Sequence, residues 1–83
     1  MKVKKNIAIS DTGFVFDPST GDSYTLNSTG LEIVQMIKSG LNNDEIKEAM
    51  THRYDVDAHS FERYFMDFLG MLKNMQLVTN NEE

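Results

Sequence analysis

The hydrophobic pattern of this chain changes its period near residue 27. Before this point apolar residues alternate with other residues, in the pairs Ile7 and Ile9, Phe14 and Phe16, and Tyr24 and Leu26. An alternation of period two is typical of half-buried β-strands. The segments 11–13 and 17–22, which separate the pairs, carry the Asp, Gly and Pro that turns require. The first third of the chain therefore predicts a three-stranded antiparallel meander.

After residue 26, one signature of a helix start occurs three times. An apolar residue precedes an Asn or Asp, and a second apolar residue follows four positions later, in the segments 26–31, 41–46 and 56–61. The polar side chain caps a backbone N–H, and the two apolar residues close over it as a hydrophobic staple. Glu45 completes a capping box with Asn42. We therefore expect helices starting near 27, 42 and 57, the first ending at Gly40, the second near Arg53 or Tyr54 and the third near Asn74.

A meander followed by three helices, the last two joined by a tight turn, predicts an α+β domain resembling a winged helix-turn-helix. The 83 residues suit a single domain, which we place at 1–79 with a polar tail at 80–83. There is no cysteine, which excludes disulfides, thiolate metal sites and a cysteine nucleophile. No apolar run approaches a membrane span, and the start of the chain lacks the apolar stretch of a signal peptide. We expect a cytoplasmic protein.

Candidate chemistry is sparse. His52, Asp55, Asp57 and His59 fall within eight residues, but the two histidines do not share a helix face and Asp57 already serves as a cap, so no metal site is expected. No phosphate-binding glycine loop, nucleophile elbow or Ser/His/Asp spacing is present. We expect no catalytic activity and no cofactor.

The third helix has more apolar surface than one core contact requires. Phe61, Phe65, Phe68, Leu69 and Leu72 fall on one stripe, and all of them except Phe68 are expected in the core. Phe68 and the flanking Tyr64 and Met71 fit either the core or a groove for a peptide, because tyrosine is amphipathic and methionine adapts its shape. Both interpretations stay open on the pattern alone.

The two edges of the expected sheet differ. Lys2, Lys4 and Lys5 guard the first strand against edge-to-edge pairing. The third strand has no lysine or proline, and it consists of Ser23, Tyr24, Thr25 and Leu26. Such an edge either accepts an incoming strand through its backbone or is too short to need protection. It can also pair with its own copy, which leaves a homodimer open.

The chain resembles the PqqD family, the pyrroloquinoline quinone synthesis protein D group. The resemblance rests on the Leu26-Asn27 helix entry, on Gly40, on the segment Arg53-Tyr54-Asp55-Val56-Asp57 and on the last helix. It implies a RiPP recognition element, a peptide chaperone that binds the leader of a ribosomally made precursor peptide. The leader would add as a strand at Ser23, Tyr24, Thr25 and Leu26 and pack against Tyr64, Phe68 and Met71. The chaperone would then present it to a radical S-adenosylmethionine enzyme with a SPASM-type extension.

Two other functions stay open. A DNA-binding winged helix would place the third helix in the major groove, but the net charge of −5 and the mixed signs of Glu62, Arg63, Asp67 and Lys73 disfavour contact with phosphates. A general protein-interaction adaptor would use the same edge and groove for a partner other than a leader.

Overall fold

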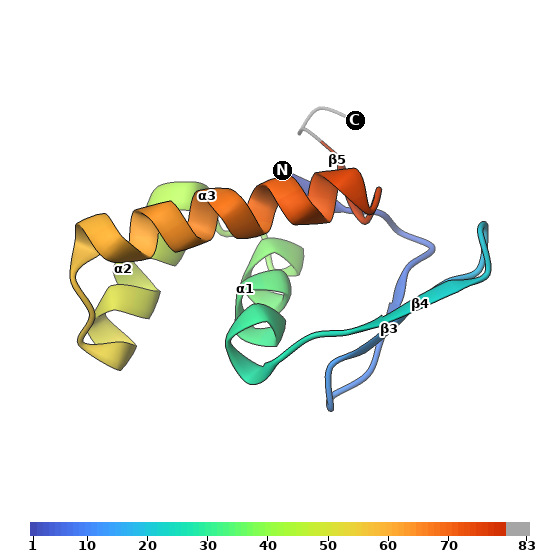
Figure 1. The fold of residues 1–83 in the computed structure, drawn as a ribbon, viewed down its shortest axis with the longest axis horizontal. Coiled ribbons are helices and arrows are strands. Elements are labelled where there is room, and N and C mark those ends of the chain that lie inside the picture. Colours follow the sequence, from blue (N-terminus) through green and yellow to red (C-terminus); the bar gives the residue numbers. More distant parts are fainter. Residues whose placement is uncertain (80–83) are drawn as a thin grey trace.

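The computed structural model describes residues 1–79, and the predicted tail at 80–83 lies outside the described residues. Three antiparallel strands form a sheet in the order β2 (Ala8–Ile9), β3 (Phe14–Asp17) and β4 (Asp22–Thr25). Three helices follow, α1 (Ser28–Lys38), α2 (Asn43–Tyr54) and α3 (Ala58–Asn74), and α3 is the longest (Figure 1). The predicted α+β class, with a meander before three helices, is confirmed.

A second, small sheet joins the two ends of the described chain. Strand β1 (Lys2–Val3) pairs antiparallel with β5 (Val78–Thr79), and the Lys4 N–H donates to the Leu77 carbonyl at 3.0 Å. This sheet was not expected from the sequence, and Lys2 lies in β1 and not on the edge of the meander, where it was expected. A strand of two residues is too short for an alternation to be visible in the sequence.

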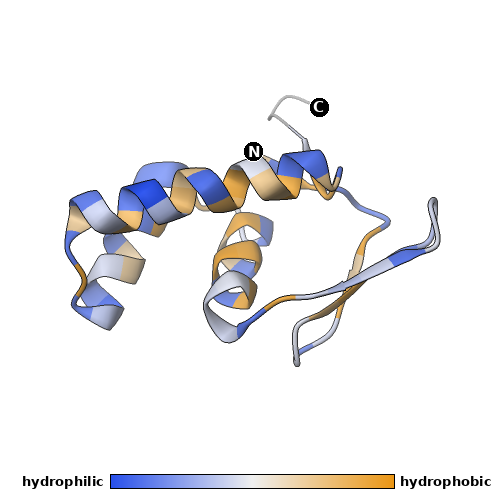
Figure 2. Ribbon diagram, viewed as in Figure 1, coloured by the Kyte–Doolittle hydropathy of each residue, from blue (hydrophilic) through white to orange (hydrophobic). Residues whose placement is uncertain are grey.

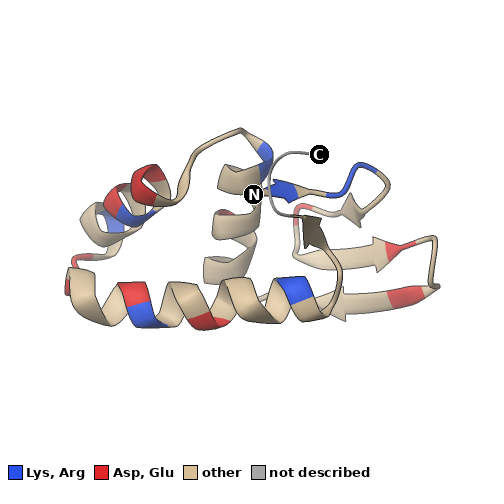
Figure 3. Cartoon of the chain, turned by 90° about the horizontal axis from the view of Figure 1, so that it is seen from above, with Lys and Arg blue, Asp and Glu red and all other residues tan. Residues whose placement is uncertain are grey.

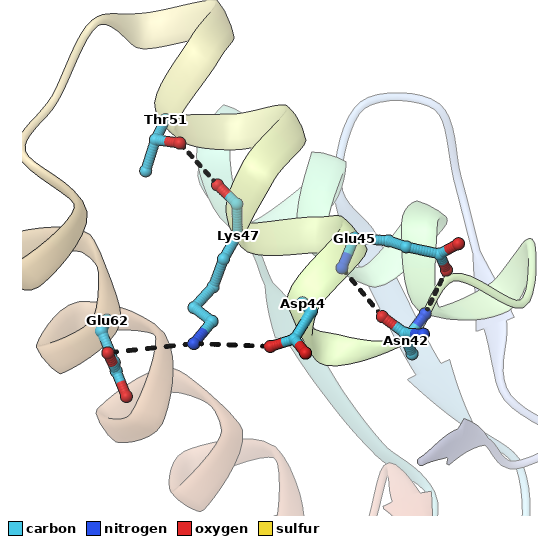
Figure 4. Close-up of polar contacts among 6 residues, drawn as sticks. All are labelled: Asn42, Asp44, Glu45, Lys47, Thr51 and Glu62. Carbon is cyan, nitrogen blue, oxygen red and sulfur yellow. Dashed lines mark hydrogen bonds and ion pairs between the residues drawn. The ribbon is translucent and has the colours of Figure 1, made fainter.

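All three predicted helix caps are present. The Oδ1 atoms of Asn27 and Asn42 accept the N–H groups of Gly30 and Glu45, each at 2.8 Å, and Asp57 accepts the N–H of Ser60 at 2.9 Å. The Glu45 carboxylate accepts the Asn42 N–H at 2.8 Å, which closes the capping box (Figure 4). The starts of the helices are therefore fixed by local side-chain chemistry.

The end of α1 is fixed in the same local way. Gly40 has a φ of +98°, and its N–H donates to the Ile37 carbonyl while the Leu41 N–H donates to Met36. This pair of bonds is the Schellman motif, which needs a left-handed residue just past the helix. The expected terminator at Gly40 is confirmed.

The core lies where α3 crosses α1 and packs on α2 and the sheet. Figure 2 shows apolar residues on the side of α3 that faces α1. Side chains from every layer are fully enclosed there, among them Val15, Ile33, Ile46, Phe65 and Leu72. Between α2 and α3, Lys47 also bridges Asp44 and Glu62 at 3.7 and 3.8 Å (Figure 4).

The alternation in β3 is confirmed, but its buried side is the opposite of the expected one. Phe14 and Phe16 are 49% and 39% exposed, whereas Val15 between them is 1% exposed. Because Phe14, Val15 and Phe16 are all apolar, the sequence permits either side to face the core. Strand pairing determines which side of β3 faces the core, because Val15 stands opposite Ile9 and Tyr24, which both pack against the core.

Truncation of the enclosed Leu72 to alanine should lower the free energy of unfolding by about 2–5 kcal/mol, because it leaves a cavity in a close-packed core. Met66 is on the same helix but 47% exposed. Met66→Ala should therefore change stability by less than about 0.5 kcal/mol. Urea denaturation followed by circular dichroism measures both values, and an equal loss in the two variants would contradict this description of the core.

Acid should weaken the cap of α3. The Ser60 backbone N–H, followed by the Ser60 side chain, holds the pKa of Asp57 below its ordinary value. A carboxyl with a lowered folded pKa adds stability above its unfolded pKa of about 3.9, and that stability is lost as the pH falls further. Asp57→Asn keeps the capping oxygen but does not titrate. The stability advantage of the wild type over this variant should shrink from pH 6 to pH 3 in urea titrations, and a constant difference would show that the charge contributes nothing.

Candidate functional site

The β4 edge of the three-stranded sheet is open. Among the described residues β4 pairs with β3 alone. The Leu26 N–H donates to the Gly13 carbonyl at 2.8 Å, toward β3, and Tyr24 stands opposite Val15 in the ladder. Because alternate residues of an antiparallel strand direct their N–H and C=O to opposite sides, Ser23 and Thr25 direct theirs to the open edge.

Both ends of β4 are held firmly against β3. At one end Gly13 has a φ of +96°, and a side chain there would meet the Leu26 carbonyl oxygen at 2.5 Å. At the other end the buried Asp17 accepts hydrogen bonds from the Ser19 N–H at 3.0 Å and the Ser19 hydroxyl at 2.7 Å. The hydroxyl bond is the main reason that the pKa of Asp17 is lowered, against the opposing effect of burial. The open edge is therefore a preformed straight segment.

A hollow of about 470 Å³ lies among the three helices. Its lining is mostly apolar and comprises Asn27, Thr29, Met50, Tyr54, Val56, Ser60, Phe61 and Tyr64. We call it the helix hollow. It begins at Asn27, two residues after the end of β4. An extended segment on the open edge would therefore reach it directly.

Aromatic stacking positions Tyr64 on the wall of the helix hollow. Its ring stacks on that of Phe68 with centroids 6.0 Å apart and an interplanar angle of 11°. Phe68 in turn packs on α1 at Gly30, where an added side chain would meet the ring at 3.0 Å. Gly30 thus lets Phe68 approach the backbone of α1, and Phe68 holds Tyr64 at the surface, where it is 39% exposed.

The opposite rim is held by polar contacts between α2 and α1. Glu32 accepts hydrogen bonds from the Tyr54 hydroxyl and from Arg53, both at 2.7 Å. The first of these bonds is the main reason that the pKa of Tyr54 is raised. Tyr54 is therefore a neutral donor over the physiological range, and its ring is held at the rim.

The open edge of β4 is on the α3 side of the sheet, and residues of α3 also line the helix hollow. Seen from above (Figure 3), β4 is the strand of the three-stranded sheet nearer to the line of α3, and β3 lies on its other side. In Figure 1, β4 passes below α3 and leads into α1. The arrangement offers backbone hydrogen-bonding groups on β4 and an apolar hollow at the end of the same path.

The structure separates the seven predicted peptide contacts into two groups. Ser23 and Thr25 lie on the open edge, Tyr64 lines the helix hollow, and Met71 is 40% exposed two turns further along α3. The other three pack inward, with Tyr24 partly buried, Leu26 7% exposed and Phe68 8% exposed. The burial of Tyr24 is the main cause of its raised pKa. The residues that pack inward hold the accessible ones in position.

Sequence reasoning missed the contribution of α2 to the hollow. Met50 and Tyr54 of α2 line it together with Val56 of the following turn, and Tyr54 and Val56 are 45% and 42% exposed. The available signal was the pair of apolar residues on either side of Asp55, which has the left-handed φ of 53° that turns α2 into α3. An exposed apolar pair beside a tight turn indicates a binding surface more than a core.

The described residues 1–79 hold no group of three or more His, Asp or Glu side chains that could bind a metal ion. In the same residues, no helix has the length and apolar character needed to cross a membrane.

Comparison with known proteins gives two results. Residues 13–78 match the family model described as coenzyme PQQ synthesis protein D, PqqD. A solved structure described as TbiB1 in complex with the TbiA(beta) leader peptide is similar, with a TM-score of 0.88 and 28% identity over 100% of both chains. No curated protein matches. Because the family model covers most of the sequence, from the turn before β3 to the start of β5, this chain belongs to the PqqD family.

Proposed function

We propose that this protein binds the leader segment of a precursor peptide as an added strand on β4. The observation that carries the proposal is the likeness, along the full length of both chains, to the structure of TbiB1 in complex with a leader peptide. The open edge at Ser23 and Thr25 supports it, because an unpaired strand edge binds an extended peptide through main-chain hydrogen bonds. The adjoining apolar hollow supplies a place for side chains.

The direction of the bound peptide follows from the direction of β4. An added antiparallel strand runs opposite to β4, so its N-terminal end lies beside Thr25 and its C-terminal end beside Asp22. Leader residues just before the paired segment therefore enter the helix hollow. We expect one or two apolar or aromatic side chains at that place in the leader, because the hollow is mostly apolar.

The protein itself acts as a carrier in this proposal. The part of the precursor that follows the paired segment leaves the domain beyond the β3–β4 turn, where an enzyme can reach it. We propose that this enzyme is a radical S-adenosylmethionine maturase of the SPASM type and that the encounter takes place in the cytoplasm. Mass spectrometry of the precursor after incubation with the purified maturase, with and without this protein, tests the step. A modification rate that does not depend on the added protein would remove it from the reaction.

Two proline variants separate the two sides of β4. Thr25→Pro removes an N–H that faces the open edge, so the melting temperature should change little while leader affinity falls about tenfold or more. Tyr24→Pro removes an N–H that faces β3 and should lower the free energy of unfolding by about 1–3 kcal/mol. Calorimetric titration with a synthetic leader and thermal melting measure the two effects. Wild-type affinity in a folded Thr25→Pro protein would show that the leader binds elsewhere.

Truncation of Tyr64 tests the helix hollow independently of the strand. Tyr64→Ala should weaken leader binding about tenfold, because a partly exposed aromatic ring on a binding surface contributes about 1 kcal/mol or more. The matched control is Met66→Ala, a similarly exposed residue of α3 outside the lining of the hollow. Equal affinities of the two variants, measured with the same synthetic leader, would exclude Tyr64 from the site.

A further inference from the structure

A second hollow has a quite different character from the helix hollow. It measures about 580 Å³ and lies between β1, the segment after β1 and the end of α1. Four lysines line it, Lys2, Lys4, Lys5 and Lys38, together with Met1, Val3, Ile7, Ile37, Gly40, Leu41 and Asn42. We call it the basic hollow. No Asp or Glu is part of its lining.

The charge of the chain is strongly segregated. The four lysines of the basic hollow are half of the eight basic residues, in a chain of net charge −5 with 13 acidic residues. Figure 3 shows blue segments in the N-terminal strand, in the loop that follows it and at the end of α1. Among residues 1–79 the ion pairs involve other cations, namely Lys47 and Arg53. The basic hollow is therefore a concentrated positive site on an acidic protein.

The acidic side chains around the basic hollow already have partners. Asp17, which interacts electrostatically with Lys4, accepts hydrogen bonds from the Ser19 N–H and hydroxyl. Asn42, on the rim, precedes Asp44 and Glu45 in the first turn of α2. The Glu45 carboxylate is held by the Asn42 N–H at 2.8 Å, and Asp44 is 3.7 Å from Lys47 (Figure 4). These contacts direct both carboxylates to partners within α2 and its cap.

Two of the four lysines have local roles that do not require a partner. Lys2 is on a short strand, where charge discourages aggregation, and Lys38 is in the last turn of α1, where a cation favours the helix dipole. These roles do not account for the convergence of four lysines, from β1, the segment after it and the end of α1, around the apolar Val3, Ile37 and Leu41. Lysines over an apolar floor complement a segment that carries both acidic and apolar side chains.

We propose that the basic hollow binds an acidic, amphipathic segment of the enzyme that processes the leader. This rests on the proposed function, in which the protein carries a peptide to an enzyme and must contact both. In Figure 3, the blue segments that line the basic hollow lie on the side of the molecule away from α3, whereas β4 lies on the side toward α3. The two partners therefore bind at the same time without competing for a surface.

The first experiment uses a labelled helical peptide in which glutamates on one face oppose leucines on the other, followed by fluorescence anisotropy. The wild type should bind it, with an affinity that falls as salt rises from about 0.05 to 0.5 M because the contact is electrostatic. A matched peptide with lysine in place of each glutamate should not bind. Lys2→Glu/Lys5→Glu should weaken binding about tenfold or more, since it replaces two attractions by repulsions.

The control variant is Arg63→Glu/Lys73→Glu, which makes the same change in charge on exposed positions of α3. It should bind the acidic peptide much more strongly than Lys2→Glu/Lys5→Glu does. Glutamate also guards a strand edge, so both variants should remain monodisperse in light scattering. If both variants lose the same affinity for the acidic peptide, binding depends only on the net charge of the protein, and the proposal is overturned. Displacement of the peptide by duplex DNA at about 0.15 M salt, an ionic strength that screens long-range attraction, would overturn it in favour of a nucleic acid.

The second experiment separates this inference from the proposed function. Calorimetry with the synthetic leader should give the same affinity for Lys2→Glu/Lys5→Glu and the wild type, while binding of the purified maturase to the leader complex weakens about tenfold. Unchanged maturase binding would overturn the docking role of the basic hollow and would leave the proposed function intact. Failure of every variant to bind the leader would instead remove the proposed function, and the acidic-peptide titration would still report on the hollow.

Discussion

Phe68 packs against the backbone of α1 at Gly30, and both the core and the helix hollow depend on this contact. A side chain at position 30 would meet the phenylalanine ring at 3.0 Å, so even a methyl group there would require the ring to shift. On the inner side of this contact the ring joins the core with Phe65 and Leu72. On the outer side it carries Tyr64. The core and the wall of the helix hollow are therefore two sides of one packing arrangement.

This dual use explains why a small domain can offer a rigid binding surface. A chain of this length buries a limited apolar area, and it can hold few side chains in place solely for binding. Here the supporting residues Leu26 and Phe68 belong to the core and Tyr24 packs against it. The accessible residues are their neighbours in the chain or in a stack. The open edge is held likewise by Gly13 and Asp17, which also form the turns of the sheet. Preformed surfaces of this kind lose little conformational entropy when a peptide binds.

The features that the sequence predicted correctly are those determined by neighbouring residues. The caps at Asn27, Asn42 and Asp57 and the stop at Gly40 each depend on groups within a few positions along the chain, so their signals are complete in the sequence. The buried side of β3 was expected wrongly because three consecutive apolar residues fit either orientation, and only pairing with Ile9 and Tyr24 selects Val15. The β1–β5 pair and the contribution of α2 to the helix hollow depend on segments brought together by tertiary packing. Local patterns do not encode such contacts.

The two hollows differ in what they can recognise, and this difference suits a protein that joins two partners. Binding at the open edge relies on backbone groups, which every peptide possesses, so selection there falls to the apolar side chains that the helix hollow admits. The basic hollow relies on charge, which acts over a longer range and favours rapid, reversible association. A carrier gains from that division, because it retains its peptide through short-range packing while it meets and leaves an enzyme through electrostatic attraction. Since most changes in affinity arise in the dissociation rate, the apolar site of the proposed carrier would govern how long the leader stays, and its lysines would govern how often the enzyme arrives.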